Sequence, residues 1–147
     1  MLLIAHRGNL NGREEEHENT VPYINAALEK GVDVEVDVWG KGRFLYLGHN
    51  KPLNLIDPVY LKNPSLWCHA KNLEALVQLQ YLNTRGGYNI HYFWHQKDDV
   101  TLTSKNYIWA FPGKQPIENS IAVMPEIHTD SLSKCKGICS DYVETYK

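Results

Sequence analysis

The stretch Val32-Asp33-Val34-Glu35-Val36-Asp37-Val38-Trp39 decides the fold expected for this chain. Successive side chains of a β-strand point to opposite faces, so this stretch places its valines on one face and its carboxylates on the other. Carboxylates on one face lie roughly 7 Å apart, close enough to disfavour each other's ionisation. Two interpretations remain open: an antiparallel strand with a solvated acidic face, or a strand of a barrel or α/β sheet whose carboxylates hold a divalent metal.

The residues before this stretch predict a β-α-β unit. Leu2 to Ala5 form a short apolar run, as expected of a buried first strand. Asn19-Thr20 supplies an N-cap for a helix over about Val21 to Lys30, which Gly31 ends. Such a unit joins parallel strands, which are usually covered on both faces, so a solvated acidic face becomes less favourable.

The residues after it complete the predicted fold. Arg43 to Leu47 is expected to pair back on the acidic strand, Asn72 to cap a second helix, and Asp98-Asp99 to form a short helical turn. The remaining apolar runs indicate strands over Leu66–Ala70, Asn89–Trp94, Tyr107–Phe111, Ser120–Met124 and Lys136–Ser140. We therefore expect an α/β protein with a single domain over residues 1–147, a reduced TIM-type (β/α) barrel with abbreviated helices. It would stand at the small end of a fold that typically needs about 200 residues or more.

Composition argues against some partners and locations. A formal net charge of −2, a pI near 6.4 and the lack of a basic run give no electrostatic reason to expect a nucleic-acid partner. The apolar start, Met1 to Ala5, is too short for a signal peptide or a membrane span. We therefore expect a soluble cytoplasmic protein without stable membrane insertion, in which Cys68, Cys135 and Cys139 are reduced thiols.

The carboxyl ends of the predicted strands carry the residues that suit catalysis, since that is where a parallel barrel places its working side chains. These residues are His6, Arg7, Glu35, Asp37, His49, His69, Lys71 and His95. Each alone has a structural explanation, but together at one rim they predict an active site. Trp39, Trp94 and Trp109 form either an apolar wall of this site or core, with core favoured, and Asp141 lies either at the rim or in a turn.

Four segments in order resemble the N-terminal signature of the glycerophosphodiester phosphodiesterase family, whose wider group includes phosphatidylinositol-specific phospholipases C and sphingomyelinases D. They are Ile4-Ala5-His6-Arg7-Gly8, Glu18-Asn19-Thr20, Glu35-Val36-Asp37-Val38 and Leu47-Gly48-His49-Asn50, and they cover about the first third of the chain. The resemblance implies a TIM-type barrel and metal-dependent hydrolysis of a phosphodiester, with a small glycerophosphodiester as the expected substrate.

The resemblance also implies residue roles. His6 and His49 would be the general acid/base pair, Glu35 and Asp37 the metal ligands, and Arg7 a phosphate contact. Glu18 would help to organise the rim. The chemistry agrees, because attack on an anionic diester needs charge neutralisation, which a metal together with Arg7 and Lys71 supplies, and histidine transfers protons near neutral pH.

One position departs from the family. Where its members usually have Glu-x-Lys, this chain has His69-Ala70-Lys71, so the lysine is kept and a carboxylate is replaced by an imidazole. If His69 is a ligand, the site favours Mn²⁺ or Zn²⁺; if it only supports the ligands, water completes a Mg²⁺ site. One divalent metal is expected in either case, with Mg²⁺, Ca²⁺ or Mn²⁺ as candidates and Zn²⁺ possible with His69 bound.

Two other functions stay open. The small size and the missing carboxylate suit a catalytically silent module that binds phosphoesters, and the same histidines and acids suit a sphingomyelinase D or phospholipase-like lyase that releases a cyclic phosphate. The sequence leaves the substrate alcohol and the oligomeric state undetermined.

Overall fold

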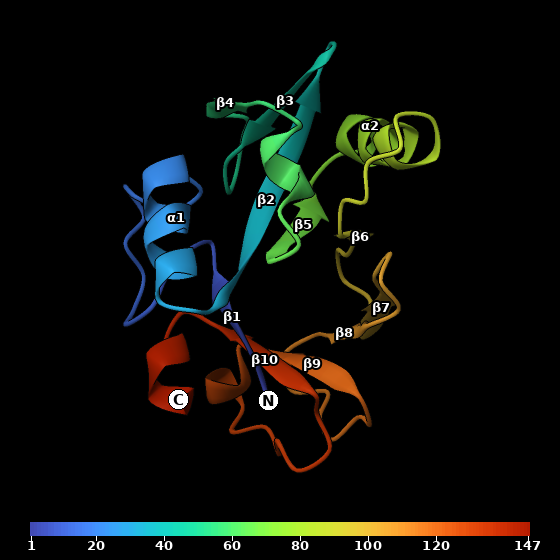
Figure 1. Cartoon of the computed structure of the whole chain (residues 1–147). Coiled ribbons are helices and arrows are strands. Elements are labelled where there is room, and N and C mark those ends of the chain that lie inside the picture. Colours follow the sequence, from blue (N-terminus) through green and yellow to red (C-terminus); the bar gives the residue numbers. More distant parts are fainter.

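Ten strands form one mixed sheet that curls into an open half-barrel in the computed structural model, which describes all 147 residues (Figure 1). The strands are β1 (Leu2–His6), β2 (Asp33–Lys41), β3 (Phe44–Leu47), β4 (Asn54–Ile56), β5 (Leu66–Ala70), β6 (Tyr92–Trp94), β7 (Val100–Leu102), β8 (Ile108–Ala110), β9 (Ser120–Val123) and β10 (Gly137–Ser140). The α-helices are α1 (Val21–Glu29) and α2 (Leu73–Thr84), and 3-10 turns occur at Tyr60–Lys62, Pro125–Ile127 and Val143–Tyr146. Neither α-helix is long and apolar enough to cross a lipid bilayer.

The prediction of a TIM-type barrel is wrong. A TIM barrel alternates strand and helix throughout, whereas only two α-helices are present here, and β3, β4 and β7 pair in antiparallel fashion. The segments that join β8 to β9 and β9 to β10 carry Pro112, Pro116 and Pro125, which do not fit a helix interior, and no α-helix forms there. The parallel part of the sheet runs β6-β5-β2-β1-β10-β9-β8.

Strand β2 is the centre of the sheet. It pairs in parallel with β1 and β5, and its last residues pair with β3 in the antiparallel sense, as the sequence predicted. The valines Val34, Val36 and Val38 are fully buried on the side that packs with α1 and α2. The alternation of apolar and acidic residues therefore sorts the two faces of β2 as expected, and the carboxylates lie on the concave side.

A second, smaller core fills the floor of the concave side. Its buried residues are Ile4, Trp67, Phe93, Trp109, Ile121 and Cys139. Trp109 is only 3% exposed and packs on Phe93 with 4.6 Å between ring centroids, which supports the core interpretation for this tryptophan. Strands β6 and β7 do not pair, but one hydrogen bond, from Ser104 N to the Tyr92 carbonyl at 2.8 Å, links the residues after β7 to β6.

Two local predictions need correction, and one is confirmed. Asn72 caps α2, because its Oδ1 accepts a hydrogen bond from Ala75 N at 3.0 Å. Thr20 is the N-cap residue of α1, but its side chain makes no capping bond and the side chain of Asn19 bonds to Asp37 instead. Asp98-Asp99 forms a bend that leads into β7, not a helical turn.

Candidate active site

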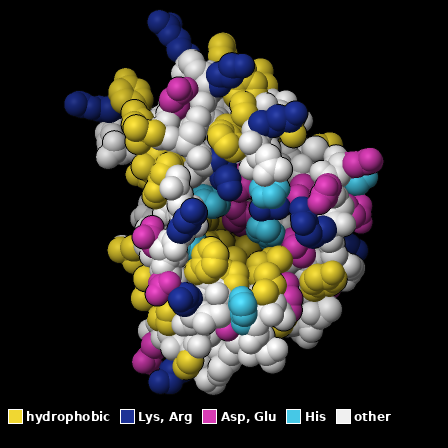
Figure 2. Space-filling model, turned by 180° about the vertical axis from the view of Figure 1, so that it is seen from behind, with side chains coloured by type: hydrophobic (Ala, Val, Ile, Leu, Met, Phe, Trp, Pro, Cys, Tyr) yellow, Lys and Arg dark blue, Asp and Glu magenta, His cyan; other side chains and the backbone are white.

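The carboxyl ends of β1, β2, β5 and β6 bring six of the predicted residues to one hollow on the concave side. They are His6, Arg7, Glu35, His69, Lys71 and His95, and Asp37 lies beside them. Strand register sets this arrangement, because His6 lies beside Glu35 on the neighbouring strand and Asp37 lies beside His69. The hollow has a volume of about 180 Å³ and includes Arg7 and Lys71 in its lining. Figure 2 shows histidine, acidic and basic side chains gathered around a hollow near the middle of this face, with hydrophobic side chains bordering it.

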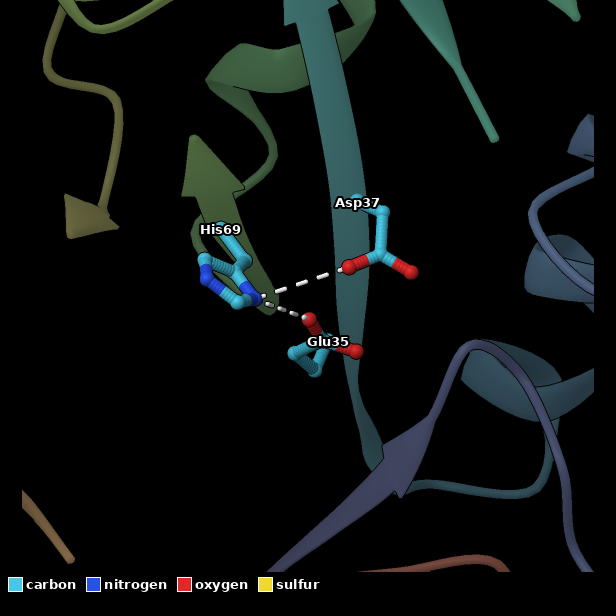
Figure 3. A group of neighbouring side chains, drawn as sticks. All are labelled: Glu35, Asp37 and His69. Atoms are coloured by element: carbon cyan, nitrogen blue, oxygen red, sulfur yellow. Dashed lines mark ion pairs between the residues drawn. The ribbon is translucent and has the colours of Figure 1, made fainter. Parts of the chain in front are cut away.

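Glu35, Asp37 and His69 form a compact group of possible metal ligands (Figure 3). His69 Nδ1 lies 3.5 Å from Glu35 Oε1 and 3.5 Å from Asp37 Oδ1. Both acids are only 1% exposed, and Glu35 Oε2 and Asp37 Oδ1 have no hydrogen-bond partner. A buried carboxylate oxygen without a donor is costly, and a divalent ion would offset that cost, so these residues fit a metal.

The ring of His69 is held in one orientation. Its Nε2 lies 2.7 Å from the carbonyl oxygen of His95, and because a carbonyl only accepts, Nε2 carries the proton. Nδ1 therefore faces the two carboxylates. Burial alone would lower the pKa of His69, but the carboxylates of Asp37 and Glu35 outweigh it and raise the pKa to about 9.

Cations surround Asp37. Arg7 Nε donates to Asp37 Oδ2 at 2.9 Å, and Lys71 Nζ lies 3.5 Å from Asp37 Oδ1. Burial raises the pKa of this carboxyl, but His69, Arg7 and Lys71 together hold the pKa below its usual range. Arg7 Nη1 also donates to Glu18 Oε2 at 3.4 Å, so the structure places Glu18 beside the rim residue that it was predicted to organise.

Two of the six non-glycine residues with positive φ lie beside Asp37. Arg7 and Asn19 have φ of 57° and 58°, a left-handed conformation that costs a non-glycine residue about 1–2 kcal/mol. Asn19 offsets part of this cost, because its side chain both donates to Asp37 Oδ2 and accepts from Asp37 N. The strain positions the Arg7 and Asn19 side chains around one carboxylate.

His6 is oriented by Asp141, for which the sequence left two locations open, the rim and a turn. Its Nδ1 lies 2.8 Å from Asp141 Oδ1, and its Nε2 faces the hollow at 3.9 Å from Glu35 Oε2. Burial raises the pKa of Asp141, but the hydrogen bonds from His6 and Asn9 lower it, so the carboxylate accepts and His6 Nδ1 donates. Asp141 thus lies in the turn after β10 and also contacts the rim residue His6, so both alternatives hold.

Asn9 and Asn19 are site residues that sequence reasoning missed. Asn9 is fully buried and donates through Nδ2 to both Asp141 Oδ1 and Glu18 Oε1, each at 2.8 Å. Asn9 and Asn19 lie in a polar segment without periodicity. The only sequence signal for a role in the site is that Asn9 follows the His-Arg-Gly motif and Asn19 lies within the Glu-Asn-Thr motif.

His49 lies apart from His6. It is half-buried and lines a neighbouring hollow of about 230 Å³, together with Arg13, Glu18 and Lys51. Burial and the nearby Arg7 lower its pKa, so its imidazole is near enough to sense the charges of the site. The two hollows meet at the Arg7–Glu18 ion pair, and no hydrogen bond joins the two histidines.

Comparison of the chain with protein-family models, with curated proteins and with solved structures found no match. The resemblance to glycerophosphodiester phosphodiesterases therefore rests on the four motifs alone.

Proposed function

We propose that this protein cleaves a phosphodiester, with a glycerophosphodiester as the expected substrate, by proton transfer at His6 beside a divalent metal. The supporting observation is one hollow lined by His6, Arg7, Lys71 and Glu35. Behind this lining, Asp141 bonds to His6 and Asp37 pairs with Arg7 and Lys71, and Glu35 and Asp37 each keep one buried oxygen without a hydrogen bond. Anion-binding groups, a proton-transfer group and a metal site are the three requirements of phosphodiester cleavage.

The chain's own residues divide the work as follows. Arg7 and Lys71 bind the phosphate oxygens, since both line the hollow beside Asp37. Asp141 holds the Nδ1 proton of His6, so Nε2 is free to accept a proton from the attacking hydroxyl. His49 donates a proton to the leaving alkoxide from the adjoining hollow. Glu35, Asp37 and His69 would hold the metal, which when bound neutralises charge on the phosphate.

The experiment is hydrolysis of glycerophosphodiesters and of bis-(p-nitrophenyl) phosphate, with EDTA or with added Mn²⁺, Mg²⁺ or Ca²⁺. We expect His6→Ala to lower kcat by about 10²–10⁴-fold, the contribution of general acid/base catalysis. The matched control is His128→Ala, because His128 is an exposed histidine outside the hollow. Unchanged turnover in a chain that combines His6→Ala, His49→Ala and Glu35→Ala would contradict the proposal.

One observation favours a second candidate, a silent module that binds phosphoesters. His49 lines a separate hollow, and such a module needs no second proton-transfer group. The silent module predicts saturable binding of a glycerophosphodiester without turnover. If the wild-type chain turns substrate over and His49→Ala abolishes that turnover, the silent module is excluded. If turnover occurs, ³¹P NMR of the first product distinguishes hydrolysis from release of a cyclic phosphate.

The proposed location is the cytoplasm. Cys68, Cys135 and Cys139 are all free thiols, which suits a reducing compartment.

A further inference from the structure

We propose that the Glu35–Asp37–His69 centre selects a transition-metal ion, such as Zn²⁺, Co²⁺ or Mn²⁺, over Mg²⁺ and Ca²⁺, with His69 Nδ1 as a direct ligand. The role of this ion in turnover rests on the proposed function, but its binding and selectivity do not.

The first step is that the His69 ring directs Nδ1 at the carboxylates, where a bound ion takes the place of the Nδ1 proton. The Nε2 proton is held by the His95 carbonyl at 2.7 Å, and the ring stacks on Phe93 with 5.0 Å between centroids and 14° between planes. These two contacts on different sides of the ring keep Nδ1 directed at the carboxylates. When Nδ1 is deprotonated, it is a metal ligand whose direction is already set.

The second step is that the three donors have the spacing of ligands around one small ion. Nδ1 is 3.5 Å from an oxygen of each acid, and one donor atom from each of the three residues lies within 4.8 Å of the others. Ligand atoms about 2.1 Å from a tetrahedral ion are about 3.4 Å apart.

The third step is that the carboxylates keep oxygens without hydrogen bonds. Asp37 Oδ2 is occupied by Arg7 Nε and Asn19 Nδ2, while Asp37 Oδ1, which lies 3.5 Å from His69 Nδ1, is buried without a hydrogen bond. The Glu35 oxygen without a hydrogen bond is Oε2, on the side of His6. An ion would therefore meet, at Asp37 Oδ1, an oxygen that no hydrogen-bond donor satisfies. The carboxylates also balance the charge of a divalent ion.

The donor set then decides the class of ion. Ca²⁺ takes six to eight oxygen ligands and Mg²⁺ prefers an octahedron of oxygens, so an imidazole in so small a set disfavours both. Imidazole with carboxylates suits Zn²⁺ and its neighbours, and three protein ligands leave a position free for substrate or water.

The test measures metal binding directly, on the full chain after removal of bound ions by a chelator. Calorimetry with Zn²⁺, Mn²⁺, Mg²⁺ and Ca²⁺ is expected to show transition ions binding on the order of 100-fold more tightly. His69→Glu should weaken Zn²⁺ binding by about 10-fold or more and strengthen Mg²⁺ binding. His128→Ala is the matched control and should leave every affinity unchanged.

A measurement without substitution covers the case in which His69→Glu does not fold. In the wild-type chain, substoichiometric Mn²⁺ should broaden the ring resonances of His69 before those of exposed His128. Mg²⁺ or Ca²⁺ binding as tight as Zn²⁺ binding, or a His69 ring left sharp, would overturn the inference. Turnover that EDTA leaves intact would instead count against the metal step of the proposed function.

Discussion

The position of one proton on His6 depends on Asp141, which is distant from it in the chain, and on Asn9, which follows it by three residues. Asp141 accepts from His6 Nδ1, and Asn9 donates to the same Asp141 oxygen. The pair keeps Nε2 directed at the hollow, which is the geometry that general base catalysis requires. Asp141 is thus a positioning residue in the proposed mechanism.

Asp141→Asn tests that role. The amide cannot hold the Nδ1 proton in the same way, so we expect kcat to fall by about 10²–10⁴-fold while KM changes little. Steady-state kinetics with a glycerophosphodiester measures both constants. Glu29→Gln, at an exposed position on α1, is the matched carboxyl-to-amide control, and an equal loss in both variants would speak against positioning.

A second histidine, His91, lies at the other end of the concave side and makes the free energy of unfolding depend on pH. His91 is 4% exposed, bonds through Nε2 to Thr103 Oγ1 at 2.7 Å and packs on Trp67. Burial, with a smaller effect of Lys105, lowers its pKa to about 4. The folded chain therefore keeps His91 neutral at pH values where the unfolded chain protonates it.

This difference predicts an acid sensitivity of folding. Because the folded pKa lies below the unfolded value, the unfolded state binds more protons, and stability is lost as pH falls from about 6.5 toward 4. We expect His91 to contribute a loss of roughly 1–2 kcal/mol between pH 7.5 and pH 5. Urea unfolding followed by tryptophan fluorescence measures it, and His91→Gln should show a smaller loss; an identical pH dependence would refute the assignment.

At the scale of elements, the two α-helices are attached to the sheet in different ways. Asn72, the cap of α2, also accepts from Gly40 N at 2.9 Å and donates to the Gly40 carbonyl at 2.8 Å, so it joins the helix to β2. The cap of α1, Thr20, bonds only to the carbonyl of His17 through its side chain. The start of α2 is therefore tied to the strand that carries Glu35 and Asp37.

The caps predict unequal effects on stability. Asn72→Ala removes the cap and leaves two buried groups of Gly40 without partners, so we expect a loss of about 2–3 kcal/mol. Thr20→Ala removes no capping bond and should cost about 0.5 kcal/mol or less. Denaturant unfolding compares the two variants, and equal losses would show that Asn72 does not join α2 to the sheet.

At the scale of the molecule, the half-barrel buries two acids that each keep one oxygen without a hydrogen bond, which an added cation would compensate. The folded chain holds this site formed, whereas the unfolded chain does not, so an ion that binds the folded state stabilises it. Zn²⁺ or Mn²⁺ at about 100 times its Kd should add about 2.7 kcal/mol. Thermal unfolding with and without the ion measures this gain, and a Glu35→Gln/Asp37→Asn chain that gains as much would place the ion elsewhere.

Most elements of the fold followed from local pattern. Period two in residues 32–39 predicted both faces of β2, and the turn before Phe44 predicted its antiparallel partner. The barrel prediction failed because apolar runs identify strands without saying what connects them. In the second half of the chain, proline-containing loops join the strands, so the α-helices that alternate with strands in a TIM barrel do not form there.

The sequence by itself determined which side chains share a face, because backbone geometry alternates residues along a strand wherever that strand lies. It therefore placed Glu35 beside Asp37 and set His6 and His69 at strand ends. Only the tertiary structure decided that β10 lies beside β1, which brings Asp141 to His6, and that the His95 carbonyl turns the His69 nitrogen toward the acids. Those contacts join residues far apart in the chain, and packing of the whole sheet, not local periodicity, selects them.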